Sequence, residues 1–276
     1  MSKYCYFNGK IVTEDKAKIP VTDIAVLRGY AIFDSLAGEG SKAPRLVEHL
    51  DRFYRSAKSA GIKVPVVREE LVEAIESLLK KNKFAQTKLR ILLTGGQTIN
   101  GGLEYDDKSA NICILADELL PLPNKIYENG ASLITAEYER PLSEIKTTNY
   151  SFAVSKQKDR KKAKAIEILY VLEGKVYECS TSNFFIVKDK ELITAKDGIL
   201  KGVTRKMLIK AAPKMNLKVV ERDLTVAELK TADEAFLTGT YKGILPIIKI
   251  DDFLIGKGVV GPIVKSLVQA NREGKI

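Results

Sequence analysis

Three residues far apart in the chain, Lys146, Glu178 and Arg52, have side chains whose chemistries complement one another. A lysine amine can form a Schiff base with a carbonyl carbon, and a carboxylate can keep a ring nitrogen protonated. An arginine guanidinium can bind a phosphate through paired hydrogen bonds. Pyridoxal phosphate needs all three groups, so the sequence predicts a site for this cofactor. We expect Lys146 to open a helix and Glu178 to end a strand.

Two short segments have the composition of phosphate-binding turns. Gly202, Val203 and Thr204 stand at the start of an apolar helix, where unpaired backbone N–H groups and the helix dipole attract an anion. Gly239 and Thr240 follow an apolar run, and a threonine hydroxyl can donate to a phosphate oxygen. Singly, the first segment is typical of an ordinary helix cap and the second of a turn. Only their combination indicates a site.

His49 lies three residues before Arg52, so both side chains share one face of a predicted helix. This histidine is expected to pack against the site or to support it rather than to act as a catalyst. It is the only histidine, and the three cysteines are scattered, so the sequence predicts neither a metal site nor a disulfide framework.

Hydrophobic periodicity predicts strands and helices throughout the chain, with no internal repeat, which indicates the α/β class. The predicted strands are 89–94, 111–116, 131–136, 166–172, 184–187 and 217–220, besides a hairpin over 4–12 that turns at Asn8 and Gly9. The predicted helices are 49–60, 69–81, 150–164, 204–212 and 261–272. These elements must bring the candidate side chains together.

The segment 117–123 contains two prolines and interrupts the periodicity, which is typical of an extended connector. We therefore expect a smaller N-terminal α/β domain over 1–118, a linker over 119–124, and a larger cofactor-binding α/β domain over 125–276.

Composition bounds the function further. No run approaches the roughly 18 apolar residues of a membrane span, and the first residues lack the apolar core of a signal peptide, so a cytoplasmic protein is expected. The net charge of +10 and the basic run 156–164 raise nucleic-acid binding as a rival function. That run has no interleaved aromatic residue and is typical of a solvated helix face, so no nucleic-acid partner is predicted.

The order of these motifs along nearly the whole chain resembles the class IV, or fold-type IV, pyridoxal-phosphate enzymes. This family includes branched-chain aminotransferases, D-amino acid aminotransferases and aminodeoxychorismate lyase. The resemblance rests on the segments 28–34, 49–53, 146–150, 178–185, 202–205 and 239–240. It implies a two-domain α/β (α+β) fold like that of D-amino acid aminotransferase, and a homodimer.

The resemblance also implies a role for each matching residue. Lys146 would form the Schiff base and move a proton, and Glu178 would pair with the pyridine nitrogen. The phosphate would be bound by Arg52, by the backbone at Val203 and Thr204, and by the Thr240 hydroxyl. Tyr150 would bind the phenolic oxygen of the ring, and substrate would be bound by Arg28, Phe33 and Gly239.

The implied reaction is transamination between a small apolar amino acid and a 2-oxo acid such as 2-oxoglutarate. A D-amino acid ranks slightly above a branched-chain L-amino acid, because the segment around Arg28 and Phe33 resembles a D-amino acid subgroup. The chain departs from that subgroup at Thr181, where an arginine is expected, and it has Ala37 where branched-chain enzymes can carry an arginine. Aminodeoxychorismate lyase is the alternative, and a basic nucleic-acid-binding protein is the remote one.

Overall fold

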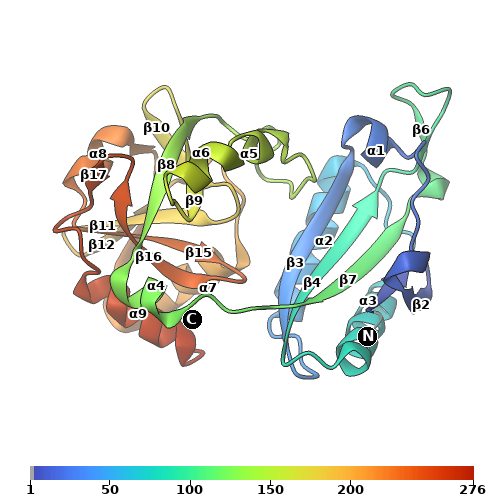
Figure 1. The fold of residues 1–276 in the computed structure, drawn as a ribbon, viewed down its shortest axis with the longest axis horizontal. Helices are drawn as coiled ribbons and strands as arrows, with labels where there is room; N and C mark the ends of the chain where they lie inside the picture. The colour runs from blue at the N-terminus through green and yellow to red at the C-terminus, as the bar shows by residue number, and fades with distance from the viewer. Residues whose placement is uncertain (1–2) are drawn as a thin grey trace. The chain divides into compact units, whose positions relative to one another are not determined.

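The computed structural model describes residues 3–276, and the chain forms two compact units (Figure 1). The first unit runs to Leu120 and also contains Ile145–Asn149, whereas the second consists of Pro121–Glu144 and Tyr150–Ile276. The domain bounds expected from the sequence stay a prediction. The division between the two units after Leu120 falls within the expected linker over 119–124, whereas 145–149, which was expected in the C-terminal domain, belongs to the first unit.

The first unit contains a five-stranded antiparallel sheet in the order β2-β1-β7-β4-β3. Its strands are β1 (Tyr4–Phe7), β2 (Lys10–Thr13), β3 (Ala31–Glu39), β4 (Gln86–Thr94) and β7 (Ile112–Glu118). Asn8 and Gly9 both have positive φ, 44° and 88°, as the two-residue turn of a hairpin requires. The predicted hairpin is therefore confirmed.

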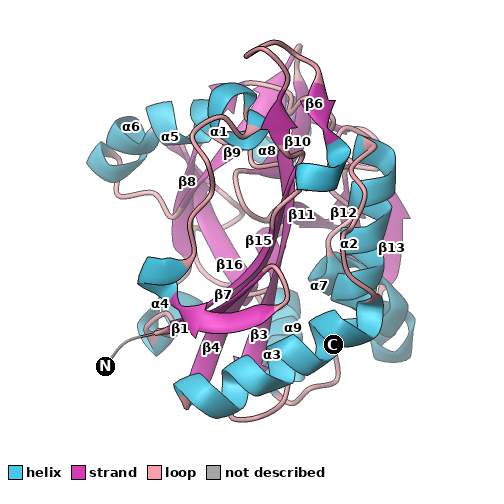
Figure 2. Cartoon of the chain, turned by 90° about the vertical axis from the view of Figure 1, so that its right-hand side faces the viewer, coloured by secondary structure: helices cyan, strands magenta, loops and turns pink. Residues whose placement is uncertain are grey.

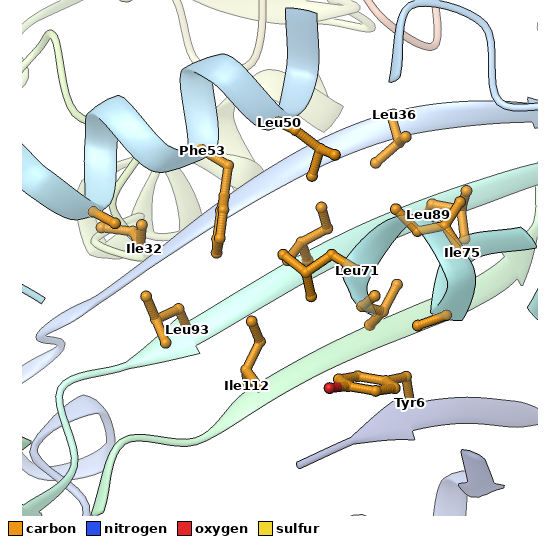
Figure 3. Close-up of a cluster of buried hydrophobic side chains, with 14 of the residues drawn as sticks. Tyr6, Ile32, Leu36, Leu50, Phe53, Leu71, Ile75, Leu89, Leu93 and Ile112 are labelled. Atoms are coloured by element: carbon orange, nitrogen blue, oxygen red, sulfur yellow. The ribbon is translucent and has the colours of Figure 1, made fainter. Parts of the chain in front are cut away.

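Two amphipathic helices, α2 (Leu46–Ala60) and α3 (Arg68–Asn82), pack on one face of this sheet. Both were predicted to within three residues of their observed bounds, because their apolar side chains recur at helical spacing. Leu50 and Phe53 of α2 point at the strands, next to Ile32 and Leu36 of β3 (Figure 3). The remaining elements of the unit are α1 (Ile24–Arg28), β5 (Gln97–Thr98) and β6 (Tyr105–Asp106), with short 3₁₀ turns at Glu14–Lys16 and Asp107–Ser109.

The second unit contains a ten-stranded mixed sheet in the order β13-β12-β11-β15-β16-β8-β9-β10-β14, with β17 paired to β16. The strands are β8 (Ala131–Glu137), β9 (Glu167–Leu172), β10 (Lys175–Cys179), β11 (Asn183–Lys188), β12 (Glu191–Thr194), β13 (Lys218–Glu221), β14 (Leu224–Thr225), β15 (Glu234–Gly239), β16 (Gly243–Ile250) and β17 (Phe253–Leu254). Along β11, Phe184 belongs to one apolar core and Phe185 to another. This central strand is therefore buried on both faces, which explains its continuous apolar run.

The helices of the second unit are α4 (Asn124–Asn129), α5 (Ser151–Ser155), α6 (Gln157–Lys162), α7 (Val203–Ala211), α8 (Val226–Thr231) and α9 (Pro262–Arg272), with a 3₁₀ turn at Ala212–Met215. One helix over 150–164 was expected, and this prediction is wrong. Two short helices, α5 and α6, occur instead, and they meet at Lys156 (Figure 2). Since α6 has no buried residue, it lacks the apolar face through which tertiary packing stabilises a longer helix.

Candidate active site

Lys146 lies along the free edge of β3 in the first unit. The Phe33 N–H donates to the Lys146 carbonyl at 2.9 Å, the Thr148 N–H donates to the Ala31 carbonyl at 3.0 Å, and Ile32 pairs with Thr147. The prediction that Lys146 opens a helix is wrong, because its backbone extends a sheet edge and α5 begins only at Ser151. The same pairing, together with the buried Ile145 side chain, explains why 145–149 belongs to the first unit.

An aromatic ring lies beneath the Lys146 ammonium group. The Lys146 Nζ atom is 4.6 Å from the centroid of the Phe33 ring, and Arg90 Cζ is 5.5 Å from the same centroid. The Lys146 N–H also donates to Ser56 Oγ of α2 at 3.4 Å. The structure therefore brings together Lys146 and Phe33, two of the residues that the sequence analysis selected.

Arg52 is buried on α2 and is bound to a residue for which the sequence analysis proposed no role. Its Nε and Nη2 atoms donate to the two oxygens of the Asp34 carboxylate at 2.7 and 2.8 Å. The ring nitrogen Nδ1 of His49 is 2.8 Å from the same carboxylate. His49 therefore supports Asp34, in line with the supporting role expected for it.

The Asp34 carboxyl group is fully buried. Burial raises its pKa, but the attraction of the Arg52 guanidinium and the hydrogen bonds from Arg52 and His49 outweigh that effect. The net pKa of Asp34 therefore lies well below its usual range. The sequence did contain a signal, since Asp34 occupies the middle of the alternating series Ile32, Asp34, Leu36, whose other members are buried and apolar.

In the second unit, Glu178 is the penultimate residue of β10 and thus lies at a strand end, as expected. Its Oε1 atom accepts from Arg140 Nε at 3.0 Å. Its Oε2 atom accepts from Asn183 Nδ2 at 3.2 Å and from the Leu200 N–H at 3.1 Å. Arg140 was not singled out in the sequence, because its contact with Glu178 spans 38 residues and follows no local pattern.

Asn183 connects Glu178 to the loop that precedes α7. Its Nδ2 atom also donates to the Leu200 carbonyl at 2.7 Å. A Cβ atom on Gly202 would lie 2.2 Å from Asn183 Oδ1, so only glycine fits there without movement. Gly202 is the N-cap of α7 and, among the described residues, no side chain caps this end of the helix. The first N–H groups of α7, including those of Val203 and Thr204, are thus suited to bind an anion.

The end of β15 lies beside the same region. Thr238 pairs with Asn183 across the sheet, and a Cβ atom on Gly239 would lie 3.1 Å from Ser182 Oγ. Within the part of the chain that the structure describes, the buried Thr238 Oγ1 atom has no hydrogen-bond partner. Thr240 follows directly after β15. The second unit therefore brings Glu178, the start of α7 and the Gly239–Thr240 turn to one region.

Lys242 is a second residue of this region to which the sequence analysis assigned no role. Its Nζ atom donates to Thr181 Oγ1 at 2.9 Å and to Glu167 Oε1 at 2.8 Å. The buried Glu167 also accepts from the Thr181 N–H at 2.7 Å and from the Ser182 hydroxyl. A lysine ammonium group thus contacts the side chain of Thr181, the position where the resemblance led us to expect an arginine.

Arg28 is the last residue of α1, because Gly29 in the left-handed conformation (φ 69°) ends this helix before β3 begins. The Arg28 guanidinium is exposed and donates to the carbonyls of Leu27 and Gly101 at 2.9 and 3.1 Å. Tyr150 is the half-buried N-cap residue of α5, in the second unit.

Two further properties hold for residues 3–276. None of the helices in this range is long and apolar enough to span a membrane. Likewise, no group of three or more histidine, cysteine, aspartate or glutamate side chains in this range is arranged to hold a metal ion.

Comparison with known proteins defines the family. The model of the family described as amino-transferase class IV matches residues 31–250. A Methanocaldococcus jannaschii protein named for branched-chain-amino-acid aminotransferase activity is 34% identical over 277 residues, which cover 97% of this chain and 95% of that protein. A D-alanine aminotransferase of Listeria monocytogenes is 30% identical over 267 residues, which cover 95% and 92%. The chain therefore belongs to the class IV aminotransferase family.

A solved structure agrees with this result. The branched-chain amino acid aminotransferase from T.th., solved with pyridoxamine 5'-phosphate, is 28% identical and superposes with a TM-score of 0.89, covering 100% of this chain and 94% of that chain. The predicted fold class is thereby confirmed. The predictions of an aminotransferase enzyme and of pyridoxal phosphate as its cofactor are also confirmed, because class IV aminotransferases use this cofactor. The roles of single site residues stay predictions.

Proposed function

We propose that this protein transfers the amino group of a small apolar amino acid to a 2-oxo acid such as 2-oxoglutarate. The connection made by Asn183 is the observation that carries the proposal. It fixes a buried carboxylate, Glu178, to the loop that ends at the uncapped start of α7. An acid for a ring nitrogen and an anion site are thus held together in one unit.

The donor set of the chain fits the cofactor. The uncapped N–H groups at the start of α7, and the buried Thr238 hydroxyl that has no partner among the described residues, are groups that a phosphate-bearing ligand can satisfy. When bound, pyridoxal phosphate supplies an electron-withdrawing ring that stabilises negative charge at the substrate α-carbon.

Two residues would perform the acid and base chemistry. The Lys146 amine would anchor the cofactor, and its Nζ atom would take a proton from the substrate α-carbon and deliver it to the C4′ carbon of the cofactor. The Phe33 ring beneath that amine supplies an apolar wall. The Glu178 carboxylate, held by Arg140 and Asn183, would keep the ring nitrogen protonated.

The other residues would bind and orient. The phosphate would be held by Arg52, by the N–H groups of Val203 and Thr204, and by the Thr240 hydroxyl. Tyr150 would hold the phenolic oxygen of the ring. The substrate would be bound by Phe33, Gly239 and Arg28.

We rank a branched-chain L-amino acid above a D-amino acid as the donor. The preference for a D-amino acid rested on the resemblance of the segment around Arg28 and Phe33 to a D-amino acid subgroup, whereas in the structure Arg28 is the exposed last residue of α1 and donates to two carbonyls. The M. jannaschii relative, named for branched-chain activity, supports this order. The D-alanine aminotransferase relative makes D-alanine the second candidate.

Borohydride reduction and peptide mapping test the cofactor anchor. Reduction of the loaded enzyme should fix the pyridoxyl group on Lys146, and Lys146→Ala should retain no reducible bond. Lys242, whose ammonium group pairs with Glu167, provides the comparison, and Lys242→Ala should still be labelled at Lys146. A label on another lysine of the parent enzyme would overturn the assignment.

A screen of amino donors tests the substrate. Each enantiomer of alanine, valine, leucine and isoleucine is offered with 2-oxoglutarate, and the change in cofactor absorbance is followed together with the keto acid formed. L-leucine, L-isoleucine and L-valine should react fastest. Faster reaction of D-alanine would favour the second candidate, and release of pyruvate and 4-aminobenzoate from aminodeoxychorismate alone would identify the lyase.

We further propose that the protein is a homodimer. The first unit exposes a set of large apolar side chains on α1 and in the nearby loops: Val21, Val26, Leu27, Ile99 and Leu103. Arg28 ties the end of α1 to the loop at Gly101. Exposed apolar side chains that gather on one unit are typical of an interface. Sedimentation equilibrium should give twice the chain mass, and a monomer would contradict the proposal.

A further inference from the structure

Asp34 is a charged residue at a core-facing position of the sheet, where apolar residues are usual. It lies on the helix-facing side of β3 between Ile32 and Leu36, and it pairs across the sheet with Ile91 of β4. All three of these neighbours are buried in the apolar core of the first unit. An unpaired carboxylate in such surroundings would be strongly destabilising, so its partners determine what it does.

Asp34 holds one particular edge of the Arg52 guanidinium group. It accepts from Nε at 2.7 Å and from Nη2 at 2.8 Å, which is the paired geometry of a strong arginine–carboxylate contact. Among the hydrogen bonds formed within residues 3–276, none involves Nη1 of Arg52. Asp34 therefore fixes the guanidinium plane through Nε and Nη2, and Nη1 stays available for a ligand.

The neighbours of Arg52 on α2 connect it to Lys146. His49, Arg52 and Ser56 are spaced at helical intervals, are all buried, and form one polar stripe on an otherwise apolar helix face. Ser56 accepts from the Lys146 N–H at 3.4 Å. Asp34 also directly follows Phe33, whose N–H donates to the Lys146 carbonyl. Asp34 and Arg52 are thus built into the same framework as the candidate anchor lysine.

We propose that Asp34 is a positioning residue for the cofactor phosphate, and that it acts by holding Arg52 with Nη1 presented to a phosphate oxygen. This inference rests on the proposed function. An arginine side chain loses much rotamer freedom when a ligand orders it, and a partner that orders it beforehand removes that cost from binding. His49 in turn orients Asp34, much as an outer partner orients a metal ligand.

The charge of Asp34 acts in the opposite direction. Its pKa lies below the usual range, so it is ionised at neutral pH and repels a phosphate. If repulsion dominated, removal of the charge would tighten cofactor binding. If positioning dominates, the same change weakens binding, so the sign of the effect distinguishes the two.

The experiment compares pyridoxal phosphate with pyridoxal, which lacks the phosphate, by titrating the cofactor-free protein and measuring both dissociation constants. Asp34→Asn keeps the shape but turns one acceptor into a donor that faces the Arg52 N–H groups. We expect it to raise the dissociation constant of pyridoxal phosphate roughly tenfold, about the effect of losing one charge-assisted contact, and that of pyridoxal less than twofold. Arg52→Ala should show the same selective loss.

Asp23→Asn is the matched control. Asp23 is equally buried in the same unit, and its carboxylate accepts from the Ala25 N–H, Thr94 Oγ1 and Asn111 Nδ2 at 2.7–2.9 Å. The Asp23→Asn substitution should leave the ratio of the dissociation constants of pyridoxal phosphate and pyridoxal unchanged. An equal loss in Asp23→Asn, or tighter pyridoxal phosphate binding in Asp34→Asn, would overturn the inference.

The binding experiment also distinguishes failure of this inference from failure of the proposed function. If Arg52→Ala selectively loses pyridoxal phosphate and Asp34→Asn does not, the positioning role fails and the function stands. If the parent protein binds neither ligand, the proposed function fails. If Asp34→Asn does not fold, His49→Gln replaces it. That variant removes only the outer contact, so a phosphate-selective loss of roughly threefold supports the role, and an unchanged ratio of the two constants overturns it.

Discussion

At the scale of single residues, a substitution at Glu178 can distinguish the effect of its negative charge from the effect of its shape. Arg140, Asn183 and the Leu200 N–H donate to its carboxylate, so the group is held in place by its surroundings. Glu178→Gln keeps the shape but not the charge, and its amide cannot accept all of these bonds. We expect turnover to fall by the equivalent of roughly 2.7–4 kcal/mol, as for loss of a preorganised electrostatic group, with a much smaller change in cofactor affinity.

Glu234→Gln is the control for that measurement. Glu234 is a buried carboxylate of the same unit, and it accepts from the N–H groups of Ile263 and Val264 at the start of α9. Its amide variant should lose stability and keep turnover per folded molecule. Equal turnover for Glu178→Gln and the parent enzyme would show that Glu178 is structural.

Arg28 is a second residue-scale case. Its exposed guanidinium donates to two backbone carbonyls, those of Leu27 and Gly101. An alanine at this position should therefore disturb the fold little. If Arg28 binds a substrate carboxylate, Arg28→Ala should raise the Michaelis constants, most strongly for the dicarboxylate 2-oxoglutarate, and leave cofactor affinity intact. Steady-state kinetics with several oxo acids measure this. Unchanged constants would remove Arg28 from the substrate site.

At the scale of elements, the loop before α7 depends on close approach of Gly202 to Asn183. Gly202→Ala would place a Cβ atom 2.2 Å from Asn183 Oδ1, although the backbone of Gly202 (φ −63°) accepts any residue. The clash should displace the start of α7 and cost roughly 1–3 kcal/mol, shared between stability and cofactor affinity. Fluorescence titration with pyridoxal phosphate and thermal unfolding measure the two parts.

Gly102→Ala is the matched substitution. A Cβ atom on Gly102 would come no closer than 3.5 Å to its neighbours, which is an ordinary contact. This variant should bind the cofactor like the parent protein. A loss of similar size in both variants would indicate that the approach of Gly202 to Asn183 has no special role.

At the scale of the whole molecule, each unit contains a buried acid whose pKa is lowered, so we expect the fold to lose stability at low pH. Burial raises the pKa of Glu167, but Lys242, Ser182 and the Thr181 N–H lower it more, so the net pKa lies below 4.5, its ordinary value. The pKa of Asp34 is likewise below its ordinary 3.8. A folded pKa below the unfolded value stabilises the fold above the unfolded value, and this stabilisation is lost as the pH falls toward the folded pKa.

The melting temperature should therefore drop from about pH 5 downward. Asp34→Asn and Glu167→Gln should each melt lower than the parent at pH 7 and should flatten the acid part of the curve, because one titrating acid is gone. Thermal unfolding by circular dichroism between pH 3 and pH 7 is the measurement. Parallel curves for parent and variants would show that these acids do not control the acid sensitivity.

The sequence by itself determined those features that depend on neighbours along the chain. The hairpin at Asn8 and Gly9 follows from turn chemistry, and the two helices of the first unit follow from apolar spacing. The order of the motifs was enough to identify the family, because each motif is local and its order along the chain is fixed. The position of Glu178 at a strand end was predicted on the same basis.

The tertiary structure alone decided how the candidate residues are supported. Lys146 was expected to open a helix, yet its backbone bonds belong to the edge of β3, more than a hundred residues earlier. Asp34 meets Arg52, and Arg140 meets Glu178, through contacts between residues 18 and 38 positions apart. Periodicity reports which face of an element is buried, but not which buried polar group lies opposite. That pairing is set by long-range packing, because each buried charge must find a partner wherever the fold supplies one.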